Sequence, residues 1–389
     1  MRKHYFLGLA ANQKRIWRRT FVYGLKRDRE DLKIALQDRY SGEAMLCKNG
    51  RSALALALKA YFNKGDKIIV NGFTCYAVYE AIKTAGLIPV WADINKDDLN
   101  FDIDKLRAAL AAARPSDTLR AALAKSSCSA EHIAADAAPK GIIIQNSLGN
   151  PVDIVAIEKF AKKHNLIIIE DLAHCAGVRY GDGREVGTVG VSTVLSFGKD
   201  KSIDATSGGA VILRHSYKNA IKAPIETPQL ADSLRERFYP MFGAICRGLS
   251  YVHLGGFLMR GLIKIHWVER SADNKLDLGK RLTNFEAKLA LEQLKNSKKS
   301  SGPIREFYLV KDRDIVLKKL RQAGYYFDSF WYEKPVSPVR YYKKVNFPED
   351  KCPVATEVSQ KIINFPTYYK KSDLSKAQKI VEEYIDGRI

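Results

Sequence analysis

The stretch that decides the fold is residues 166–213, LIIIEDLAHCAGVRYGDGREVGTVGVSTVLSFGKDKSIDATSGGAVIL. Residues 166–170 form a continuous apolar run with β-branched side chains, which predicts a strand buried on both faces of a sheet. Two more apolar runs, 191–197 and 210–213, predict two further strands, and glycine-containing loops separate the three. The stretch therefore indicates an open α/β sheet, in which ligands bind at the carboxyl ends of the strands.

Reactive side chains follow two of these strands. Glu170 and Asp171 end the first strand, and Lys199 and Lys201 come just after the second. An acid and a lysine so placed suit pyridoxal phosphate, because the lysine forms a Schiff base with its aldehyde and the acid pairs with its pyridinium nitrogen. The simpler interpretation is that Asp171 caps a helix and Lys201 is a solvated lysine, and spacing alone does not separate the two.

Four short motifs occur in order within the stretch: EDLAH at 170–174, GTVG at 187–190, SFGKDK at 196–201 and GG at 208–209. Together they resemble the DegT/StrS group of pyridoxal-phosphate-dependent sugar aminotransferases, which have fold type I. The resemblance implies Asp171 on the ring nitrogen, His174 near the ring hydroxyl and Ser196 on the phosphate. It also implies that Lys201 is the Schiff-base residue, since the family pattern S-F-x-x-x-K ends there and not at Lys199.

A glycine turn opens an alanine- and leucine-rich helix in the sequence NGRSALALAL, residues 49–58. Free amides at a helix N-terminus form an anion site. The segment resembles the family's N-G-T-A-A-L, which holds the cofactor phosphate. The resemblance implies that the backbone of Arg51 and Ser52, together with the Ser52 hydroxyl, does this here.

Two further segments resemble the family's cofactor-binding loops. In GDKIIVNGFTCY, residues 65–76, the position where many relatives stack an aromatic ring on the cofactor is Cys75, and Tyr76 follows it. The resemblance therefore gives the stacking role to Cys75 or Tyr76. Asn146 directly follows the predicted strand 141–145, at a position where relatives commonly have histidine. This asparagine is expected to donate a hydrogen bond to the ring hydroxyl.

The chain of 389 residues is long enough for more than one domain. We predict a fold type I pyridoxal-phosphate-dependent transferase with a mostly parallel central sheet and a smaller C-terminal α+β domain. The octets LRAALAAA (106–113) and LRAALAKS (119–126) predict a helical hairpin within an insertion that relatives lack. The predicted divisions are a basic N-terminal segment (1–44), a large α/β domain (45–250, insertion 103–140) and a small domain (251–389).

The net charge of +21 calls for an anionic partner. The basic residues are spread along the chain and no zinc-finger spacing occurs, so we expect no nucleic acid; a nucleotide diphosphate or a membrane surface fits the charge. Six cysteines without paired spacing indicate neither a disulfide framework nor a metal site. Together with a start that does not read as a signal peptide, they predict a cytoplasmic location.

Residues 238–268 are apolar, aromatic and basic, and their uncharged part, 248–259, is too short to cross a bilayer. We expect this segment to be buried or to form a dimer interface. The alternative is peripheral contact with an anionic membrane, on the inner face of the membrane in a cytoplasmic protein.

The resemblance implies a homodimer whose sites are built by both chains, working in cell-envelope polysaccharide biosynthesis. The expected reaction moves an amino group from an amino acid, with glutamate as donor, to a nucleotide-linked keto sugar. In the family an asparagine reaches across the dimer to the cofactor phosphate; here that position is Gly279, and Lys280 or Arg281 would have to replace it.

Three alternatives stay open. Related dehydratases use the same cofactor but have histidine in place of the Schiff-base lysine. Chemistry at a cysteine sulfur is suggested by Cys75 and Cys175, which flank the predicted site. A membrane or nucleic-acid binder without catalysis is the third, and it predicts salt-sensitive binding to anionic polymers or lipid.

Overall fold

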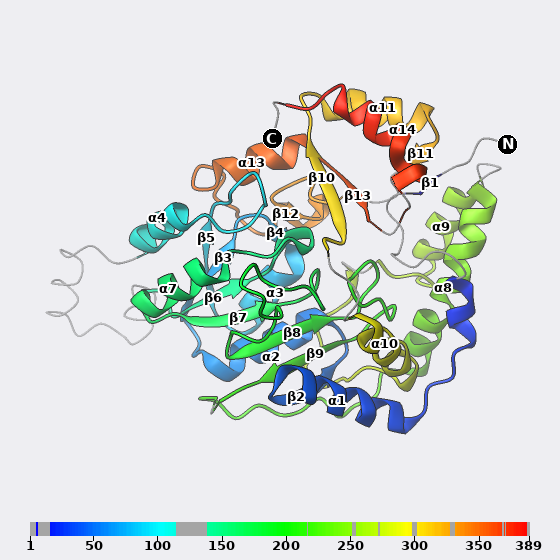
Figure 1. Ribbon diagram of the computed structural model, residues 1–389. Coiled ribbons are helices and arrows are strands. Elements are labelled where there is room, and N and C mark those ends of the chain that lie inside the picture. The colour runs from blue at the N-terminus through cyan, green and yellow to red at the C-terminus, as the bar shows by residue number, and fades with distance from the viewer. Residues whose placement is uncertain are drawn as a thin grey trace, which may run out of the picture.

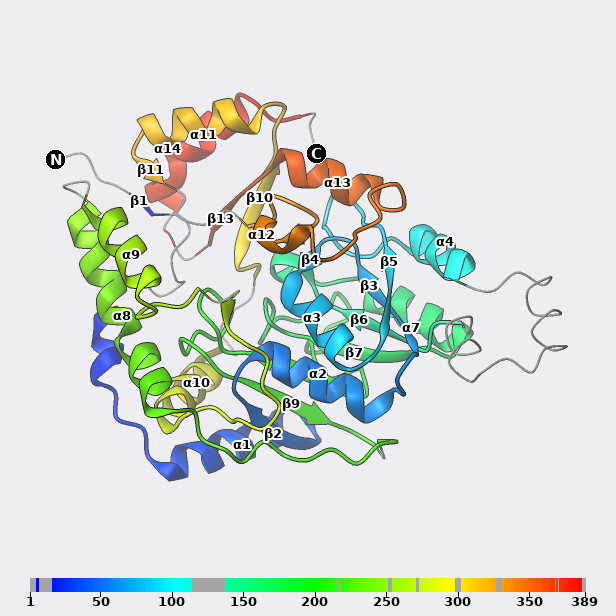
Figure 2. The same cartoon turned by 180° about the vertical axis from the view of Figure 1, so that it is seen from behind.

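The computed structural model describes residues 5–6, 16–113, 138–215, 217–250, 254–270, 273–297, 302–326, 331–367, 369 and 371–386. A central sheet with helices on both faces forms the larger part of the molecule, and C-terminal elements form a smaller unit beside it (Figures 1 and 2). The first predicted octet, 106–113, lies in helix α4 (Ile103–Ala113), whereas the second, 119–126, lies outside the described residues.

The central sheet confirms the predicted α/β fold class with a mostly parallel sheet. The three strands predicted within 166–213 lie side by side in it as β7 (Ile167–Asp171), β8 (Ser192–Ser196) and β9 (Gly209–Leu213). Strand β9 is antiparallel to both neighbours, and the other pairs of this sheet are parallel. The order across the sheet is β2 (Glu43–Cys47), β9, β8, β7, β6 (Gly141–Ile144), β3 (Lys67–Asn71) and β5 (Ile88–Ala92).

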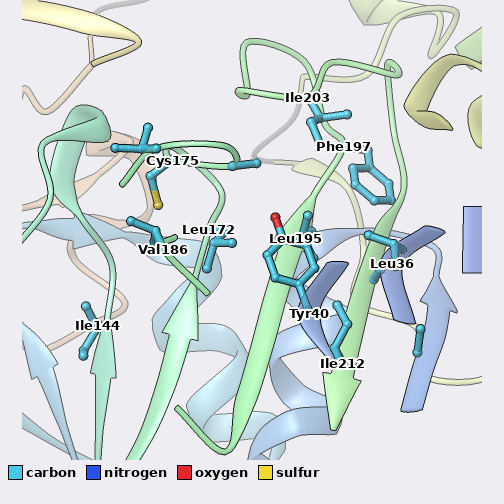
Figure 3. Packing of buried hydrophobic residues seen from close by; sticks show 14 of the residues in the cluster. Leu36, Tyr40, Ile144, Leu172, Cys175, Val186, Leu195, Phe197, Ile203 and Ile212 are labelled. Carbon is cyan, nitrogen blue, oxygen red and sulfur yellow. The ribbon is translucent and has the colours of Figure 1, made fainter. Parts of the chain in front are cut away.

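Alternate side chains of the strands enter two hydrophobic clusters, one on each face of the sheet. In β9, Ala210 and Ile212 belong to one cluster, and Val211 and Leu213 belong to the other. Figure 3 shows the first cluster, where Tyr40 packs near Ile212. Burial on both faces explains why these strands are continuous apolar runs in the sequence. The first face carries α1 (Lys26–Tyr40), α4, α7 (Ile154–His164) and α10 (Asn284–Ser297), and the second carries α2 (Gly50–Tyr61) and α3 (Tyr76–Thr84).

The packing of α1 and α10 differs from the predicted domain divisions. Leu36 of α1 and Leu291 of α10 both belong to the cluster on the first face of the central sheet. Helix α1 and the segment 282–294 are therefore part of the large unit. The cause is their apolar faces, which the sheet covers although the two helices are far apart in the chain.

The smaller unit has its own hydrophobic cluster, which includes Val316, Phe365 and Val381. It is joined to the large unit through the carboxylate of Asp93, which accepts hydrogen bonds from the backbone N–H groups of Val354 and Ala355 at 3.0 and 2.9 Å. Its elements are β1 (Tyr5–Phe6), β10 (Arg305–Leu309), α11 (Arg313–Gln322), β11 (Tyr325–Tyr326), β12 (Val336–Ser337), α12 (Val339–Tyr342), α13 (Pro353–Lys361), β13 (Ile362–Pro366) and α14 (Lys371–Glu382).

One edge of the molecule is formed by the 3₁₀ helix η1 (Ile16–Phe21) and by helices α8 (Leu230–Ser250) and α9 (Gly255–Lys264), as Figures 1 and 2 show. Helix α8 contacts both of the others. Among the described residues, no helix combines the length and the apolar character needed to span a bilayer. The two remaining short elements are β4 (Thr74–Cys75) and the 3₁₀ helix η2 (Ser147–Gly149).

Candidate active site

A cavity of about 890 Å³ opens at the carboxyl ends of β7 and β8. Asp171 is the last residue of β7 and Ser196 is the last residue of β8, so the parallel arrangement of the two strands brings both to the same edge. The structure brings together at this cavity six of the nine predicted site residues, namely Arg51, Cys75, Asp171, His174, Ser196 and Lys201.

The two acids at the end of β7 have different surroundings. Glu170 is fully buried, and its carboxylate accepts hydrogen bonds from the backbone N–H groups of Gly187, Val189 and Gly190 at 2.6–2.8 Å. The Tyr180 hydroxyl adds a fourth hydrogen bond at 2.6 Å. Glu170 therefore holds the GTVG loop in place, which leaves Asp171 as the acid that faces the cavity.

Burial raises the pKa of the Asp171 carboxyl, although the N–H of Ala173, at 3.0 Å, and the charge of Lys201 act in the opposite direction. The raised pKa means that the protein alone does not fully compensate the carboxylate's lost hydration. A cation placed beside this carboxylate, such as a protonated pyridine nitrogen, would favour its charged form.

Lys201 points at an imidazole. Its Nζ lies 3.1 Å from Nε2 of His174 and 5.3 Å from the centroid of the Trp331 ring. The His174 and Trp331 rings are stacked with centroids 5.1 Å apart. Burial, and then the charges of Lys201 and Arg305, lower the pKa of His174 well below its ordinary value. His174 is therefore neutral at pH 7, and its ring can accept a hydrogen bond from the Lys201 ammonium.

The competing lysine is held elsewhere. Lys199 Nζ lies 3.2 Å from Oε2 of Glu236 and donates a hydrogen bond to the backbone carbonyl of Glu269 at 2.8 Å. Asp200 stands between the two lysines in the sequence. Its Oδ1 is buried without a hydrogen-bond partner among the described residues. Burial raises the pKa of Asp200 to about 7. No sequence pattern singled out Asp200, because it falls on a variable position of the S-F-x-x-x-K motif.

The N-terminus of α2 forms a cradle against β8. Asn49 caps the helix by accepting a hydrogen bond from the Ser52 N–H at 2.9 Å, and Gly50 then packs on Ser196. A Cβ on Gly50 would lie 2.6 Å from the Ser196 Cβ, closer than atoms tolerate. With the buried acid and the lysine, this combination of a helix N-terminus, a serine hydroxyl and close backbone approach fits the phosphate and ring of pyridoxal phosphate.

Three predicted residues lie away from the cavity. The Ser52 hydroxyl donates to Asn49 Oδ1 at 2.9 Å and accepts from the Asp277 N–H at 3.0 Å, so it ties loops together inside the protein. The Tyr76 ring stacks on Tyr341, with centroids 4.5 Å apart. Asn146 is fully buried, and its Oδ1 accepts a hydrogen bond from the Val152 N–H at 2.9 Å.

Two residues that the sequence patterns did not identify line the cavity near these positions. Gln145, next to Asn146, reaches the cavity and accepts a hydrogen bond from the Thr74 hydroxyl at 2.7 Å. Trp331 comes from the smaller unit, far from the motifs in sequence, and only its place in the aromatic stretch YYFDSFWY (325–332) could have drawn notice.

The two cysteines that flank the predicted site are not equivalent. Cys75 lines the cavity, whereas Cys175 is fully buried in the hydrophobic cluster of the first sheet face (Figure 3). Burial, and then the charge of Asp171, raise the pKa of the Cys175 thiol well above its ordinary value. Cys175 is therefore an inert core thiol.

The family model for the DegT/DnrJ/EryC1/StrS aminotransferase family matches residues 39–227. A pleiotropic regulatory protein of Geobacillus stearothermophilus is 31% identical over 180 residues, which is 46% of this chain and 41% of the relative. A GDP-perosamine synthase of Caulobacter vibrioides is 29% identical over 201 residues, 51% of this chain and 47% of the relative. A GDP-4-keto-6-deoxy-D-mannose 3-dehydratase of Yersinia pseudotuberculosis is 29% identical over 161 residues, 41% of this chain and 34% of the relative. Each match thus spans less than half the length of the relative.

Solved structures extend the likeness to nearly the whole chain. A DegT/DnrJ/EryC1/StrS aminotransferase from Brucella abortus superposes with a TM-score of 0.62 at 20% identity, covering 94% of this chain and 92% of that one. At this identity the likeness establishes the shared fold, which is that of fold type I enzymes.

Proposed function

Residues 39–227 belong to the DegT/DnrJ/EryC1/StrS aminotransferase family, and from this premise we propose that the chain is a pyridoxal-phosphate-dependent aminotransferase. It moves an amino group from an amino acid, with glutamate as donor, to a nucleotide-linked keto sugar. The observation that carries the proposal is a lysine amine, Lys201, held 3.1 Å from the neutral His174 in a cavity that also contains the buried acid Asp171.

The roles of the chain's own residues follow from their positions. Asp171 holds the proton on the ring nitrogen, and Ser196 with the amides at the start of α2 holds the phosphate. Lys201 would hold the cofactor covalently and, when its amine is released, would move the proton of the reacting carbon. When bound, pyridoxal phosphate supplies the electron-withdrawing ring that makes this carbon acidic. His174, being neutral, orients the Lys201 amine.

An anionic substrate is supported by the charge of the cavity. Arginines from the sheet edge, from α8 and α9 and from the smaller unit line it, and the chain carries a net charge of +21. Guanidinium groups bind phosphates in a bidentate manner, so a nucleotide diphosphate fits this wall. The Caulobacter relative is named GDP-perosamine synthase, which points to nucleotide-sugar amination in cell-envelope polysaccharide synthesis. The arginines are Arg51, Arg247, Arg260, Arg270, Arg313, Arg321 and Arg340.

The test supplies the purified protein with pyridoxal phosphate, glutamate and a panel of nucleotide keto sugars, and follows the release of 2-oxoglutarate. Borohydride treatment followed by peptide mass spectrometry locates the cofactor on the chain. We expect turnover and an adduct on Lys201, no turnover in Lys201→Ala, and an unchanged Lys201 adduct in Lys199→Ala. A protein that stays colourless with the cofactor and gives no adduct would refute the proposal.

Sugar dehydration is the second candidate, because the Yersinia relative is named a dehydratase. Lys201 supports amination, since the resemblance assigns histidine to that position in dehydratases. Loss of water from the keto sugar without release of 2-oxoglutarate would favour dehydration. Sulfur chemistry has less support, because of the two cysteines only Cys75 reaches the cavity.

We also propose that the chain forms a homodimer, which light scattering can measure. We further propose that the edge formed by η1, α8 and α9 contacts an anionic membrane. This edge exposes large apolar side chains, and η1 and α9 contain Arg18, Arg260 and Lys264 but no acid. An isologous dimer through the same edge would place these like charges opposite each other, whereas anionic lipid would neutralise them. The exposed apolar residues of this edge include Trp17, Phe21, Ile245, Leu254, Phe257, Ile265 and Trp267.

A further inference from the structure

Lys199 and Lys201 are two residues apart, both line the cavity, and both carry the same primary amine. Only a neutral amine attacks an aldehyde carbon. The lysine that bonds to the cofactor is therefore the one whose surroundings leave its amine free to lose a proton and to move. The contacts of the two side chains differ in this respect.

Lys199 is enclosed by groups that contact its side-chain amine. Its Nζ lies 3.2 and 3.3 Å from the two carboxylate oxygens of Glu236 and 2.8 Å from the backbone oxygen of Glu269. The face of the Tyr239 ring lies against it, with the centroid 4.2 Å from Nζ. The Lys199 side chain is only 5% exposed. A carboxylate, a carbonyl and an aromatic face together stabilise a buried cation.

Lys201 has no such enclosure. Its Nζ lies 3.1 Å from Nε2 of the neutral His174 and 5.3 Å from the centroid of the Trp331 ring. Among the described residues, no carboxylate lies within ion-pair distance of its Nζ. The amine of Lys201 is therefore less restrained by its contacts than that of Lys199.

We propose that Glu236 and Tyr239 of α8 are specificity-determining residues that hold the Lys199 amine in place, so that the cofactor bonds to Lys201 alone. The inference rests on the proposed function. In the selected step the neutral Lys201 amine attacks the aldehyde carbon of pyridoxal phosphate and a carbon–nitrogen double bond forms. The aldehyde oxygen leaves as water with the two amine protons, so no oxidant or reductant is needed.

The two side chains that hold Lys199, from Glu236 and Tyr239, come from a part of the chain that the family motifs do not cover. Glu236 and Tyr239 lie in α8, beyond residues 39–227, the part of the chain that matches the family model. Lys199 itself falls on a variable position of the S-F-x-x-x-K motif. The family motifs therefore specify neither Lys199 nor the residues of α8 that hold it.

The experiment loads the full-length protein with pyridoxal phosphate, reduces the carbon–nitrogen bond with borohydride, and quantifies the adduct on each lysine by peptide mass spectrometry. In the Lys201→Ala protein, we expect very little adduct on Lys199. In Lys201→Ala/Glu236→Gln, the Lys199 adduct should rise at least about tenfold, which corresponds to about 1.4 kcal/mol. Adding Lys199→Met should remove this adduct and so confirm its position.

Two controls keep the test specific. Glu269→Gln in the Lys201→Ala background makes the same charge change nearby, but Glu269 contacts Lys199 only through its backbone oxygen, so labelling should stay low. Tyr239→Leu removes the aromatic face and should also raise Lys199 labelling, which provides a second variant if Glu236→Gln does not fold. Equal Lys199 labelling in Lys201→Ala with and without the Glu236→Gln and Tyr239→Leu substitutions would overturn the inference. A wild-type protein with no adduct on either lysine would instead refute the proposed function.

Discussion

At the scale of single residues, the site uses two adjacent acids for different purposes. Glu170 satisfies four hydrogen-bond donors of the surrounding loops, and this makes it a structural anchor. Asp171 accepts one backbone hydrogen bond. This contact does not fully compensate the hydration that its carboxylate loses on burial, as the raised pKa of Asp171 indicates. Such an under-compensated acid is suited to pair with a cationic ligand group.

Asp171→Asn tests this role. The asparagine keeps the shape but removes the negative charge, so the ring nitrogen loses the partner that keeps it protonated. We expect turnover to fall by about 100-fold or more, the range seen when one preorganised electrostatic group is removed. The borohydride adduct on Lys201 should persist, because bonding to the aldehyde does not require Asp171. Unchanged turnover in this variant would contradict the assigned role.

Asp200→Asn tests the cost of a buried carboxyl beside the two lysines. Because burial raises the folded-state pKa of Asp200 from 3.8 to about 7, the folded chain binds this proton more tightly than the unfolded chain. Stability from this residue is therefore present below about pH 4 and is lost as the pH rises to about 7. The asparagine also tolerates the positive φ of 65° at this position.

Urea unfolding at several pH values measures the effect. We expect the free energy of unfolding of Asp200→Asn to exceed that of the wild type by about 2–4 kcal/mol at pH 8, and by much less at pH 4. A difference between the two proteins that does not change with pH would show that Asp200 does not titrate in this range.

At the scale of elements, the phosphate cradle depends on how closely the start of α2 approaches the end of β8. The N-cap by Asn49 fixes the first turn, and the glycine at position 50 permits contact with Ser196. The motif NGRSA is thus explained by one cap and one steric requirement. Ser52 contributes to the cap network rather than facing the cavity.

Gly50→Ala should weaken cofactor binding. Its Cβ would lie 2.6 Å from the Ser196 Cβ, so α2 and β8 must separate, at a cost of about 1–3 kcal/mol in unfolding free energy. A fluorescence titration with pyridoxal phosphate should show a Kd raised about tenfold or more. The matched control is Gly181→Ala, because a Cβ there meets no atom within 4 Å. Equal affinity of the two variants would argue against the cradle.

At the scale of the whole molecule, the cavity is closed by three regions distant in sequence: the edge of the central sheet, helices α8 and α9, and the smaller unit. The smaller unit is docked by the parallel pairing of β12 with β4, which brings Ser337 opposite Cys75. Asp93 adds two hydrogen bonds to the start of α13. These contacts set the position of Trp331 over His174 and Lys201.

Vesicle flotation tests the proposed membrane edge. The protein should float with vesicles containing anionic lipid and not with neutral ones. Arg260→Glu/Lys264→Glu should reduce the membrane partition coefficient about 30-fold or more, since each basic residue contributes about 1 kcal/mol. Lys159→Glu/Lys162→Glu on α7 makes the same charge change on the opposite side of the molecule (Figure 1) and should float normally. If the α9 variant instead loses dimerisation, the edge is an interface between two copies.

The sequence by itself determined the α/β class, the strand positions and the order of the cofactor motifs. These are local properties: a strand buried on both faces must be apolar throughout, and a motif keeps its spacing along the chain. It also identified Lys201, Asp171, His174 and Ser196, which the structure brings to one cavity.

Only the tertiary structure decided which polar side chains reach the cavity and which are used inside the protein. Ser52 and Tyr76 have suitable chemistry, but Asp277 and Tyr341, which are distant in sequence, contact them. Asn146 is buried and its Oδ1 accepts from Val152, whereas Gln145 and Trp331 line the cavity. Likewise, Lys199 differs from Lys201 because it contacts Glu236 and Tyr239, which belong to a helix later in the chain. The physical reason is that burial and pairing depend on contacts between distant segments, which no spacing along the chain encodes.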